Sequence, residues 1–206
     1  MPTPWIFRFW GALFCGLLRL ACRLEVDEFP EVGDKPVIMV ANHRSFLDGF
    51  VSICLLSRWR YPARCMVRSR YFERPIFGRV LRVLGCIPVG GEGNHPLDEA
   101  LSTLQSGVPI AIMPEGRIVA PAQRKADGIG RMHRGFVKIA RDADATIVPL
   151  GVNGTDAVWP RDKWPRLPIG GRPVVRVQIG EPIKIDEQSD DEVFAKTRVR
   201  MAALIS

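Results

Sequence analysis

The stretch that decides the fold covers residues 36–49 and reads PVIMVANHRSFLDG. Its first part, residues 37–40, is a short run of apolar, largely β-branched side chains, which is typical of a buried strand. A polar break follows, and residues 46–56 have the composition of a helix. We therefore expect His43 on the turn between a strand and a helix, with Asp48 in the first helical turn.

The five-residue spacing between His43 and Asp48 has a geometric consequence. On one continuous helix, side chains five residues apart diverge by about 140°, so this pair meets only if His43 lies off the helix and folds back over its first turn. Asp48 would then bond one ring nitrogen and leave the other free to act as a base. A second interpretation stays open, in which Ser45 and Asp48 form a variant of the capping box and His43 is an ordinary loop residue.

Length and charge narrow the class of protein. The chain has 206 residues, enough for one domain with a substantial core, and 47% of them are hydrophobic. Its formal net charge of +7 suits nucleic acid, an anionic membrane surface or anionic substrates. Because the basic residues are scattered and no recognition motif accompanies them, we do not expect nucleic acid to be the partner.

The cysteines bear on compartment and metal binding. There are five of them, Cys15, Cys22, Cys54, Cys65 and Cys86. They form no CxxC pair, and this pattern indicates buried, reduced thiols of a cytoplasmic compartment, without a disulfide framework or a zinc site. The chain also lacks a P-loop, an HExxH motif and a dinucleotide fingerprint, so we expect no metal and no cofactor.

The N-terminal segment, residues 1–24, is apolar and aromatic but contains Arg8, Arg19 and Arg23. The uninterrupted run between Arg8 and Arg19 has ten residues, which is too short to span a bilayer. On a helix the three arginines share one face, so we expect an amphipathic helix that lies in a membrane interface with its arginines at the headgroups. The alternative is a helix that packs on the core and turns its arginines to water.

Strands and helices are expected to alternate through the rest of the chain. Apolar runs and turn residues predict strands at 63–68, 86–89, 108–113, 146–152 and 174–179, and helices at 74–84, 96–105, 135–141 and 190–205. Residues 160–173, rich in Pro, Arg and Trp, are expected to form an irregular surface segment. This alternation indicates an α/β fold with a largely parallel central sheet flanked by helices.

Sites in such sheets form at the carboxyl ends of the strands, where His43 is expected to lie. A second turn of this kind is Pro-Glu-Gly-Arg at 114–117, which follows another predicted strand. Glu115 and Arg117 should therefore lie on the same edge as His43. A structural ion pair between Glu115 and Arg117 is the alternative to a functional role.

Four sequence blocks resemble those of the glycerolipid O-acyltransferases, the PlsC-like lysophosphatidic acid acyltransferase family. Residues 42–49, NHRSFLDG, resemble the family's His-x4-Asp motif, and residues 113–118, MPEGRI, resemble its Phe-Pro-Glu-Gly block. Residues 68–89 follow the family's second block, and residues 148–154 are similar to its Val-Pro-Val block. The blocks occur in family order over most of the chain, from residue 36 to residue 182.

The resemblance implies a glycerol-3-phosphate acyltransferase-like domain over residues 25–206 and an O-acyltransferase of phospholipid synthesis. A fatty acyl group would move from acyl-CoA or acyl-carrier protein to the free hydroxyl of a lysophospholipid such as 1-acylglycerol-3-phosphate. The candidate catalytic residues are His43 as general base and Asp48 as its orienting partner. Since no Gly-x-Ser-x-Gly elbow exists, transfer without an acyl-enzyme is expected. The arginines of the apolar N-terminal helix further suggest a peripheral or monotopic protein at the cytoplasmic face of the bacterial inner membrane.

The residues that would bind the substrate do not all match the family pattern. Ile118 stands where the family's Glu-Gly-Thr-Arg block has its arginine, so Arg117 corresponds to it only with a shift of one residue. We therefore take a wider set of substrate-binding candidates, namely Arg68, Glu115, Gly116, Arg117, Arg131 and Arg134. His133 lies in a basic cluster that runs from Arg131 to Lys138, and this cluster either meets phosphate or forms a solvated helix face.

Two alternatives stay open. Pro-Glu-Gly-Arg-Ile also resembles the acyltransferase part of bacterial 2-acylglycerophosphoethanolamine acyltransferases, so another lysolipid is a second possible acceptor. A basic protein with an apolar N-terminal helix is also able to bind anionic membrane without catalysing a reaction. That interpretation explains neither the His/Asp pair nor the Glu-Gly turn.

Overall fold

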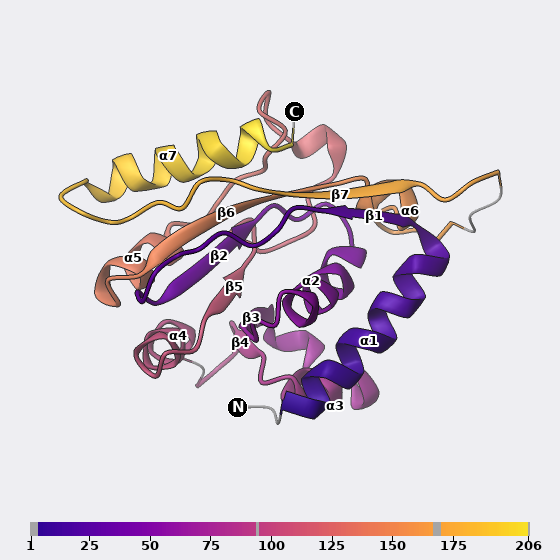
Figure 1. Cartoon of the computed structure of the whole chain (residues 1–206), viewed down its shortest axis with the longest axis horizontal. Helices are drawn as coiled ribbons and strands as arrows, with labels where there is room; N and C mark the ends of the chain where they lie inside the picture. The colour runs from indigo at the N-terminus through magenta and orange to yellow at the C-terminus, as the bar shows by residue number, and fades with distance from the viewer. Residues whose placement is uncertain (1–3, 94, 167–169, 206) are drawn as a thin grey trace.

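The computed structural model describes residues 4–93, 95–166 and 170–205, and this part of the chain forms a seven-stranded sheet covered by helices (Figure 1). The strand order is β1-β7-β6-β2-β5-β3-β4, and neighbouring strands run parallel except for the antiparallel pair β6 and β7. The strands are β1 (Arg23–Val26), β2 (Val37–Ala41), β3 (Arg64–Arg68), β4 (Ile87–Val89), β5 (Ile110–Ile112), β6 (Thr146–Asn153) and β7 (Val174–Ile179). The expected α/β fold with a largely parallel sheet is confirmed.

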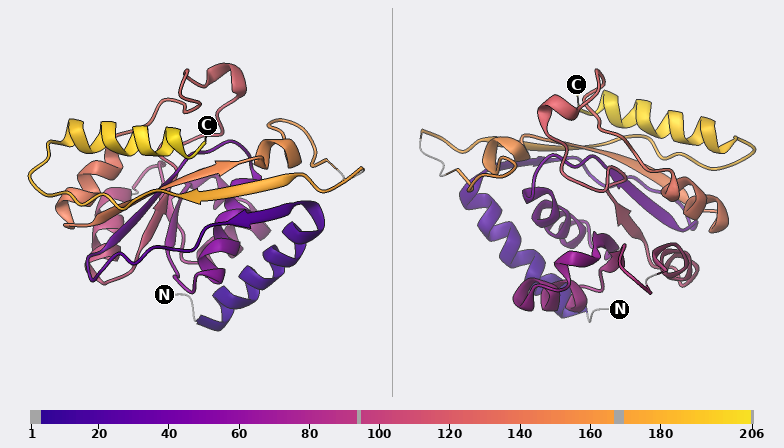
Figure 2. Two further views of the ribbon diagram at one scale, coloured as in Figure 1. Left: turned by 45° about the horizontal axis from the view of Figure 1, so that its top comes forward. Right: turned by 180° about the vertical axis from the view of Figure 1, so that it is seen from behind.

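Helices cover both faces of the sheet, with α7 on one side and α1 and α2 on the other (Figures 1 and 2). The helices are α1 (Pro4–Ala21), α2 (Leu47–Arg58), α3 (Pro75–Val83), α4 (Pro96–Gln105), α5 (Gly135–Asp142), α6 (Thr155–Val158) and α7 (Asp190–Ala203), with 3₁₀ turns at Ser69–Tyr71 and Pro121–Gln123. One hydrophobic cluster packs α1, α2 and α3 against the sheet, and a second cluster packs α4, α5 and α7 against its other face.

Strand β2 lies inside the sheet and is buried on both faces. Val37 and Met39 belong to the cluster under α1 and α2, whereas Ile38 and Val40 belong to the cluster on the opposite face. A strand with apolar neighbours on both sides needs a continuous apolar run, and this is the run that opens the quoted stretch. Its carboxyl end delivers the chain to His43 and the start of α2.

The N-terminal segment differs from the expectation. Helix α1 ends at Ala21, and Arg23–Val26 form strand β1 in parallel with β7. The prediction that all three arginines share one face of the helix is therefore wrong. Arg23 lies on the sheet and pairs with Glu25 instead of extending α1. The partner strand begins at Val174, so the pattern of residues near Arg23 contains no sign of this pairing.

Helix α1 packs closely on α2 and turns a second apolar face to solvent. A Cβ atom placed on Gly11 would lie 2.2 Å from Ser57 Cβ, and Phe14 and Leu18 are buried. The exposed face consists of Trp5, Phe9, Leu13, Leu17 and Leu20. No helix among the described residues has both the length and the apolar character that a bilayer crossing requires.

A disulfide also joins the two helices. Cys15 of α1 is bonded to Cys54 of α2, with the two Cα atoms 5.2 Å apart, while Cys22, Cys65 and Cys86 are free thiols. The expectation that all cysteines are reduced is therefore wrong. The two partners are 39 residues apart on different helices, so spacing in the sequence does not reveal them. The expected cytoplasmic compartment rested partly on reduced thiols and loses that support.

Candidate active site

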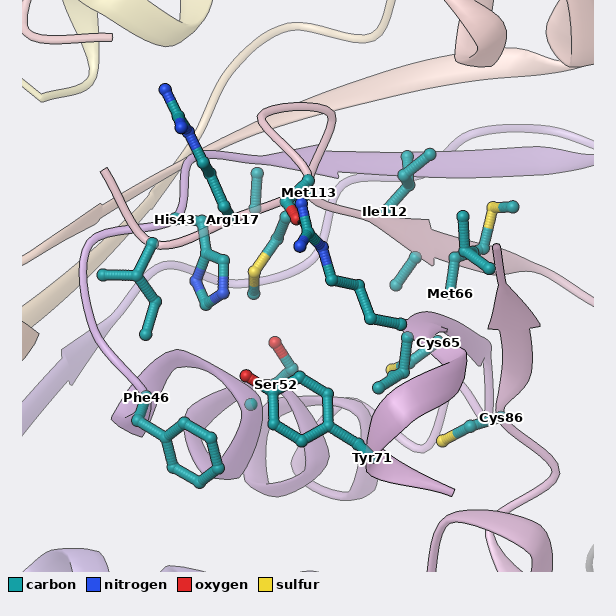
Figure 3. Close-up of a pocket in the computed structure, with 18 of the residues that line it drawn as sticks. His43, Phe46, Ser52, Cys65, Met66, Tyr71, Cys86, Ile112, Met113 and Arg117 are labelled. Atoms are coloured by element: carbon teal, nitrogen blue, oxygen red, sulfur yellow. The ribbon is translucent and has the colours of Figure 1, made fainter. Parts of the chain in front are cut away.

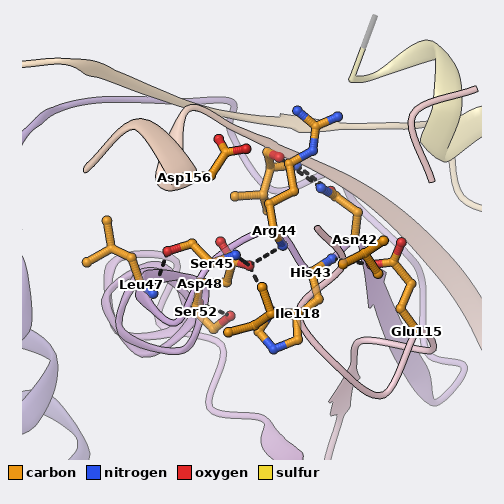
Figure 4. A network of polar contacts seen from close by, with 12 residues as sticks. Asn42, His43, Arg44, Ser45, Leu47, Asp48, Ser52, Glu115, Ile118 and Asp156 are labelled. Carbon is orange, nitrogen blue, oxygen red and sulfur yellow. Dashed lines mark hydrogen bonds and ion pairs between the residues drawn. The ribbon is translucent and has the colours of Figure 1, made fainter. Parts of the chain in front are cut away.

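His43 lies on the turn between β2 and α2, and its ring contacts Asp48 as the spacing predicted. His43 Nδ1 lies 2.8 Å from Asp48 Oδ2. The same oxygen accepts the backbone N–H groups of Arg44 at 2.7 Å and Ser45 at 2.8 Å. The Asp48 carboxylate thus accepts hydrogen bonds from the backbone of the turn, as the capping interpretation expects. It also contacts the imidazole of His43, as the catalytic interpretation expects (Figure 4).

Ser45 does not form the expected cap of α2. The helix begins at Leu47, and the flanking residue Phe46 makes no capping bond through its side chain. Ser45 Oγ instead accepts the Leu47 N–H at 3.0 Å and donates to the Trp159 carbonyl at 2.6 Å. The serine therefore ties the start of α2 to the segment that follows α6.

The orientation of the His43 ring follows from its bond to Asp48. Because the carboxylate accepts, the ring proton is assigned to Nδ1, and the lone pair of Nε2 is free to accept a proton. The ring points into a pocket and its side chain is 21% exposed, whereas the Asp48 side chain is fully buried (Figure 3). This is the base and orienter of a catalytic triad without a nucleophilic side chain.

Glu115 lies beneath the same turn. Its carboxylate accepts the His43 backbone N–H at 2.6 Å and the Gly130 N–H at 2.5 Å, and the residue is 4% exposed. Burial raises the pKa of Glu115, and these two backbone donors oppose that rise. An ion pair with Arg117 is absent from the contacts of the described residues. Glu115 therefore connects the backbone of the His43 turn to the loop that contains Gly130.

Two residues of the quoted stretch, Asn42 and Arg44, have roles that the sequence analysis missed. The Asn42 side chain donates to the Val152 carbonyl at 2.9 Å and accepts the Val152 N–H at 2.7 Å. Arg44 donates from Nη1 to Asn153 Oδ1 at 2.6 Å. Both side chains fasten the His43 turn to the end of β6. Their position next to His43 was the available signal, because polar residues at the end of a buried strand need partners.

The pocket in front of His43 has a volume of about 1210 Å³. Its wall beside α2 is a group of aromatic rings, namely Phe46, Phe50, Tyr71, Phe77 and Trp159. Its lining continues under the sheet to Cys65, Met66 and Cys86 (Figure 3). Ligand pockets are commonly apolar with a few polar groups at one place, which here is the edge that contains His43.

Three of the predicted substrate-binding residues line this pocket: Arg68, Gly116 and Arg117. Arg68 donates from Nε to the Gly116 carbonyl, which holds its guanidinium against the Glu-Gly turn. Arg117 is exposed, and its side chain extends away from the middle of the pocket, opposite to the direction of the His43 ring (Figure 3).

Arg131 and Arg134 do not line the pocket. Arg134 forms an ion pair with Asp191 of α7 and lies 5.1 Å from the centre of the Phe194 ring. Arg131 is exposed outside the pocket lining. The structure thus brings Arg68, Gly116 and Arg117 together with His43, and separates Arg131 and Arg134 from them. In the described part of the chain, no group of three or more His, Cys, Asp or Glu side chains is placed to hold a metal ion.

Comparison with known proteins identifies the family of this site. The family model described as "Acyltransferase" matches residues 23–153, which contain His43, Asp48, Arg68 and Glu115. The chain belongs to the acyltransferase family. This family member spans less than two thirds of each curated relative described next.

A chloroplastic 1-acyl-sn-glycerol-3-phosphate acyltransferase of Arabidopsis thaliana is 26% identical over 73% of this chain and 40% of its own length. An N-acylphosphatidylethanolamine synthase of the same plant is 30% identical over 73% of this chain and 57% of its own length. A probable 1-acyl-sn-glycerol-3-phosphate acyltransferase of Mycoplasma genitalium is 27% identical over 59% of the chain and 45% of its own length.

A crystal structure shares the fold of this acyltransferase family member. It is that of the 1-acyl-sn-glycerophosphate acyltransferase PlsC from Thermotoga maritima, with a TM-score of 0.77 and 18% sequence identity. The match covers 96% of this chain and 77% of that one. The shared fold therefore extends beyond the residues covered by the family model.

Proposed function

We propose that this protein transfers a fatty acyl group from a thioester to the free hydroxyl of a lysophospholipid such as 1-acylglycerol-3-phosphate. The observation that supports this reaction best is the His43–Asp48 pair at the edge of a large apolar pocket. Membership of the acyltransferase family and the activities named for the relatives agree with it.

In the proposed reaction, His43 Nε2 removes the proton of the acceptor hydroxyl as its oxygen attacks the thioester carbon. The carbon–sulfur bond then breaks, and the thiolate leaves with the proton that the imidazolium returns. General-base assistance of this kind is typically worth about 10²–10⁴-fold in rate. Asp48 is a positioning residue, because it acts on the imidazole and stabilises its charged form.

The acyl donor in this proposal is acyl-CoA or acyl-carrier protein. The apolar pocket beside α2 receives the acyl chain, so the thioester lies at the edge where the His43 ring points. A thioester is already activated for attack, and the proposed reaction therefore requires neither a metal ion nor a cofactor. The first turn of α2 contributes the positive end of its dipole near the developing oxyanion.

The exposed face of α1 supports a proposal about location. Trp5 is 67% exposed, Phe9 58% and Leu20 72%, and they recur on one side of the helix. Arg8 and Arg19 are exposed on the same helix, so we propose that α1 lies in the interface of an anionic membrane as a peripheral or monotopic anchor.

A panel of lysolipids incubated with labelled acyl-CoA and wild-type protein tests the reaction, with the product identified by mass spectrometry. We expect a diacyl product from at least one acceptor. His43→Ala should lower kcat by about 10²–10⁴-fold with little change in KM, because the base acts on the transition state. Asp48→Asn should also lower kcat while leaving KM unchanged.

The matched control is His95→Ala, because His95 is exposed and lies outside the pocket. Its kinetics should equal those of the wild type. A His43→Ala variant that retains the wild-type kcat would refute the catalytic assignment, and the absence of product from every acceptor would refute acyl transfer. Binding to membranes by a wild type without turnover would favour the non-catalytic alternative.

A further inference from the structure

We propose that Arg198 of α7 is a positioning residue for the His43 base, an inference that rests on the acyl-transfer function above. Arg198 is not among the described residues that line the pocket, and its helix packs on the face of the sheet opposite α2 (Figures 1 and 2). It acts through residues 127–130, called here the 127–130 loop, and through Glu115. The family model ends at residue 153, so Arg198 lies outside the residues by which the family is recognised.

The Arg198 guanidinium bonds the 127–130 loop at several atoms. Nε and Nη2 donate to the two carboxylate oxygens of Asp127 at 2.6 and 2.8 Å. Nη1 donates to the Gly130 carbonyl at 2.9 Å, and Nη2 donates to the Ile129 carbonyl at 3.2 Å. The planar fork of an arginine suits such a set of acceptors, whereas a lysine ammonium is a compact point charge. One side chain thus fixes the first and the last residue of the loop.

The ion pair between Arg198 and Asp127 is partly shielded from water. The side chains are 17% and 32% exposed, respectively. Burial alone would raise the pKa of Asp127, but the hydrogen bonds from Arg198 and from the Ile129 N–H outweigh burial and lower it. The carboxylate is therefore charged at neutral pH, and the shape of the loop depends on a residue 71 positions further along the chain.

Gly130 connects this loop to Glu115. The Gly130 N–H donates to Glu115 Oε1 at 2.5 Å, and the His43 N–H donates to Oε2 at 2.6 Å. A Cβ atom placed on Gly130 would lie 2.6 Å from Val119 Cγ2 and 3.1 Å from Glu115 Oε1, so only a glycine allows this close approach. Because Glu115 is 4% exposed, a displaced loop would leave Oε1 buried without this donor.

Both backbone groups of His43 are fixed by residues that pack on Gly130. The N–H is bonded by Glu115, and the carbonyl accepts the Val119 N–H at 3.0 Å. Asp48 orients the imidazole ring, while these two bonds hold the backbone that carries the ring. A misplacement of 1 Å can cost about 10²-fold in rate even when the mutated residue is far from the chemistry. Arg198 should therefore contribute to kcat from outside the pocket.

Steady-state kinetics of Arg198→Gln provide the first test. We expect kcat to fall by about 10-fold to 10²-fold, with KM for the lysolipid and for the thioester nearly unchanged. Arg198→Lys keeps the charge without the fork and should retain more activity than the glutamine variant. A wild-type kcat in Arg198→Gln would overturn the proposal.

Arg200→Gln is the matched control on the same helix. Arg200 pairs with Glu181 at 2.9 Å and also donates to the backbone carbonyl of that residue, but it does not contact the 127–130 loop. Its kinetics should equal those of the wild type. An equal fall of kcat in Arg198→Gln and Arg200→Gln would indicate a general effect of α7 and would overturn the positioning role.

A double-mutant cycle tests whether Arg198 acts through the loop. Asp127→Asn should lower kcat as Arg198→Gln does, because either change breaks the same ion pair. The double variant should then lose less than the product of the two single effects. Effects on kcat that simply multiply would contradict a shared path.

Hydrogen exchange of backbone amides, measured by NMR, does not depend on turnover. The His43 and Gly130 amides should exchange faster in Arg198→Gln than in Arg200→Gln, while the Ile147 amide, bonded to Ile183 in the core, should exchange equally in both. Unchanged exchange at His43 and Gly130 would overturn the positioning role even in an active enzyme. A wild type inactive on every acceptor would refute acyl transfer, and this measurement would still decide whether Arg198 fixes the His43 turn.

Discussion

A single carboxylate oxygen of Asp48 receives three donors, from the ring of His43 and from two backbone N–H groups. Ring orientation and turn geometry therefore depend on the same atom. An amide at this position keeps an oxygen that accepts, but it lacks the negative charge that stabilises the imidazolium. This explains why Asp48→Asn is expected to lower kcat and to leave substrate binding unchanged.

The ionisation of Glu115 gives a pH prediction. Burial raises its pKa above the ordinary value of 4.5. Between that value and the raised pKa the folded state binds more protons than the unfolded state, so the free energy of unfolding should fall as pH rises through this window. Glu115→Gln does not titrate and should lack this fall.

Urea unfolding of wild type and Glu115→Gln between pH 4 and pH 7 measures this difference. The wild type should lose stability relative to the variant as pH increases. Parallel curves for the two proteins would show that Glu115 does not contribute to the pH dependence. Measuring the difference between the two proteins removes the contribution of the other titrating groups.

At the residue scale, the sequence predicted the His43–Asp48 contact because one turn and one helix fix it locally. It did not predict that Glu115 bonds the His43 backbone, because that contact joins positions 72 residues apart. Arg134 shows the same limit. The sequence placed it among the substrate-binding candidates, but its ion-pair partner Asp191 lies on α7, and this contact is visible only in the fold.

The contact between α1 and α2 gives a prediction at the scale of elements. Because Gly11 leaves no room for a Cβ beside Ser57, Gly11→Ala should lower the free energy of unfolding by about 1–3 kcal/mol through overpacking. Gly16→Ala is the matched control on the same helix. No atom lies within 4 Å of its Cβ position, so it should raise stability by about 0.5–1 kcal/mol through helix propensity.

Denaturant unfolding of the two alanine variants gives these energies. Adding Ser57→Gly to Gly11→Ala removes the opposing Cβ and should recover part of the loss. A stability loss in Gly16→Ala equal to that in Gly11→Ala would contradict the argument, since only one of the two positions faces α2.

The exposed face of α1 gives a second prediction at this scale. Replacing Trp5, Phe9 and Leu20 together by serine should reduce binding to anionic vesicles, because it removes the apolar area that enters the interface. Flotation with phosphatidylglycerol vesicles measures the bound fraction. Val199→Ser is the control, since Val199 is 67% exposed on α7, which packs on the other face of the sheet. Equal flotation of the triple variant and the control would refute the anchor.

The whole molecule depends on contacts between segments that are distant in sequence. Alternation of apolar runs was enough to predict the sheet and the helices on it, because each run is a local signal. Strand β1 was not predictable in this way. Its four residues become a strand by pairing with β7, so their conformation is decided by residues about 150 positions away.

The disulfide between Cys15 and Cys54 gives the prediction for the whole chain. It closes a loop with a sequence separation of 39 and thereby restricts the unfolded state. A reductant should lower the free energy of unfolding by about 2–4 kcal/mol. The double variant Cys15→Ser/Cys54→Ser should have the same lowered stability, measured by urea unfolding with and without dithiothreitol. A further loss when the reductant acts on the double variant would contradict this assignment.

The close contact of α1 with α2 has a consequence for how the protein meets a bilayer. Helix α2 carries Asp48 near its start and contacts α1 through Cys54 and Ser57 near its end. If α1 lies in the interface as proposed, its contact with α2 fixes the distance between the His43 ring and the plane of the lipid headgroups. A lysolipid reaches the base only when its hydroxyl rises to that distance. Under the proposed acyl transfer, we therefore expect the acceptor lysolipids to come from the leaflet in which α1 lies.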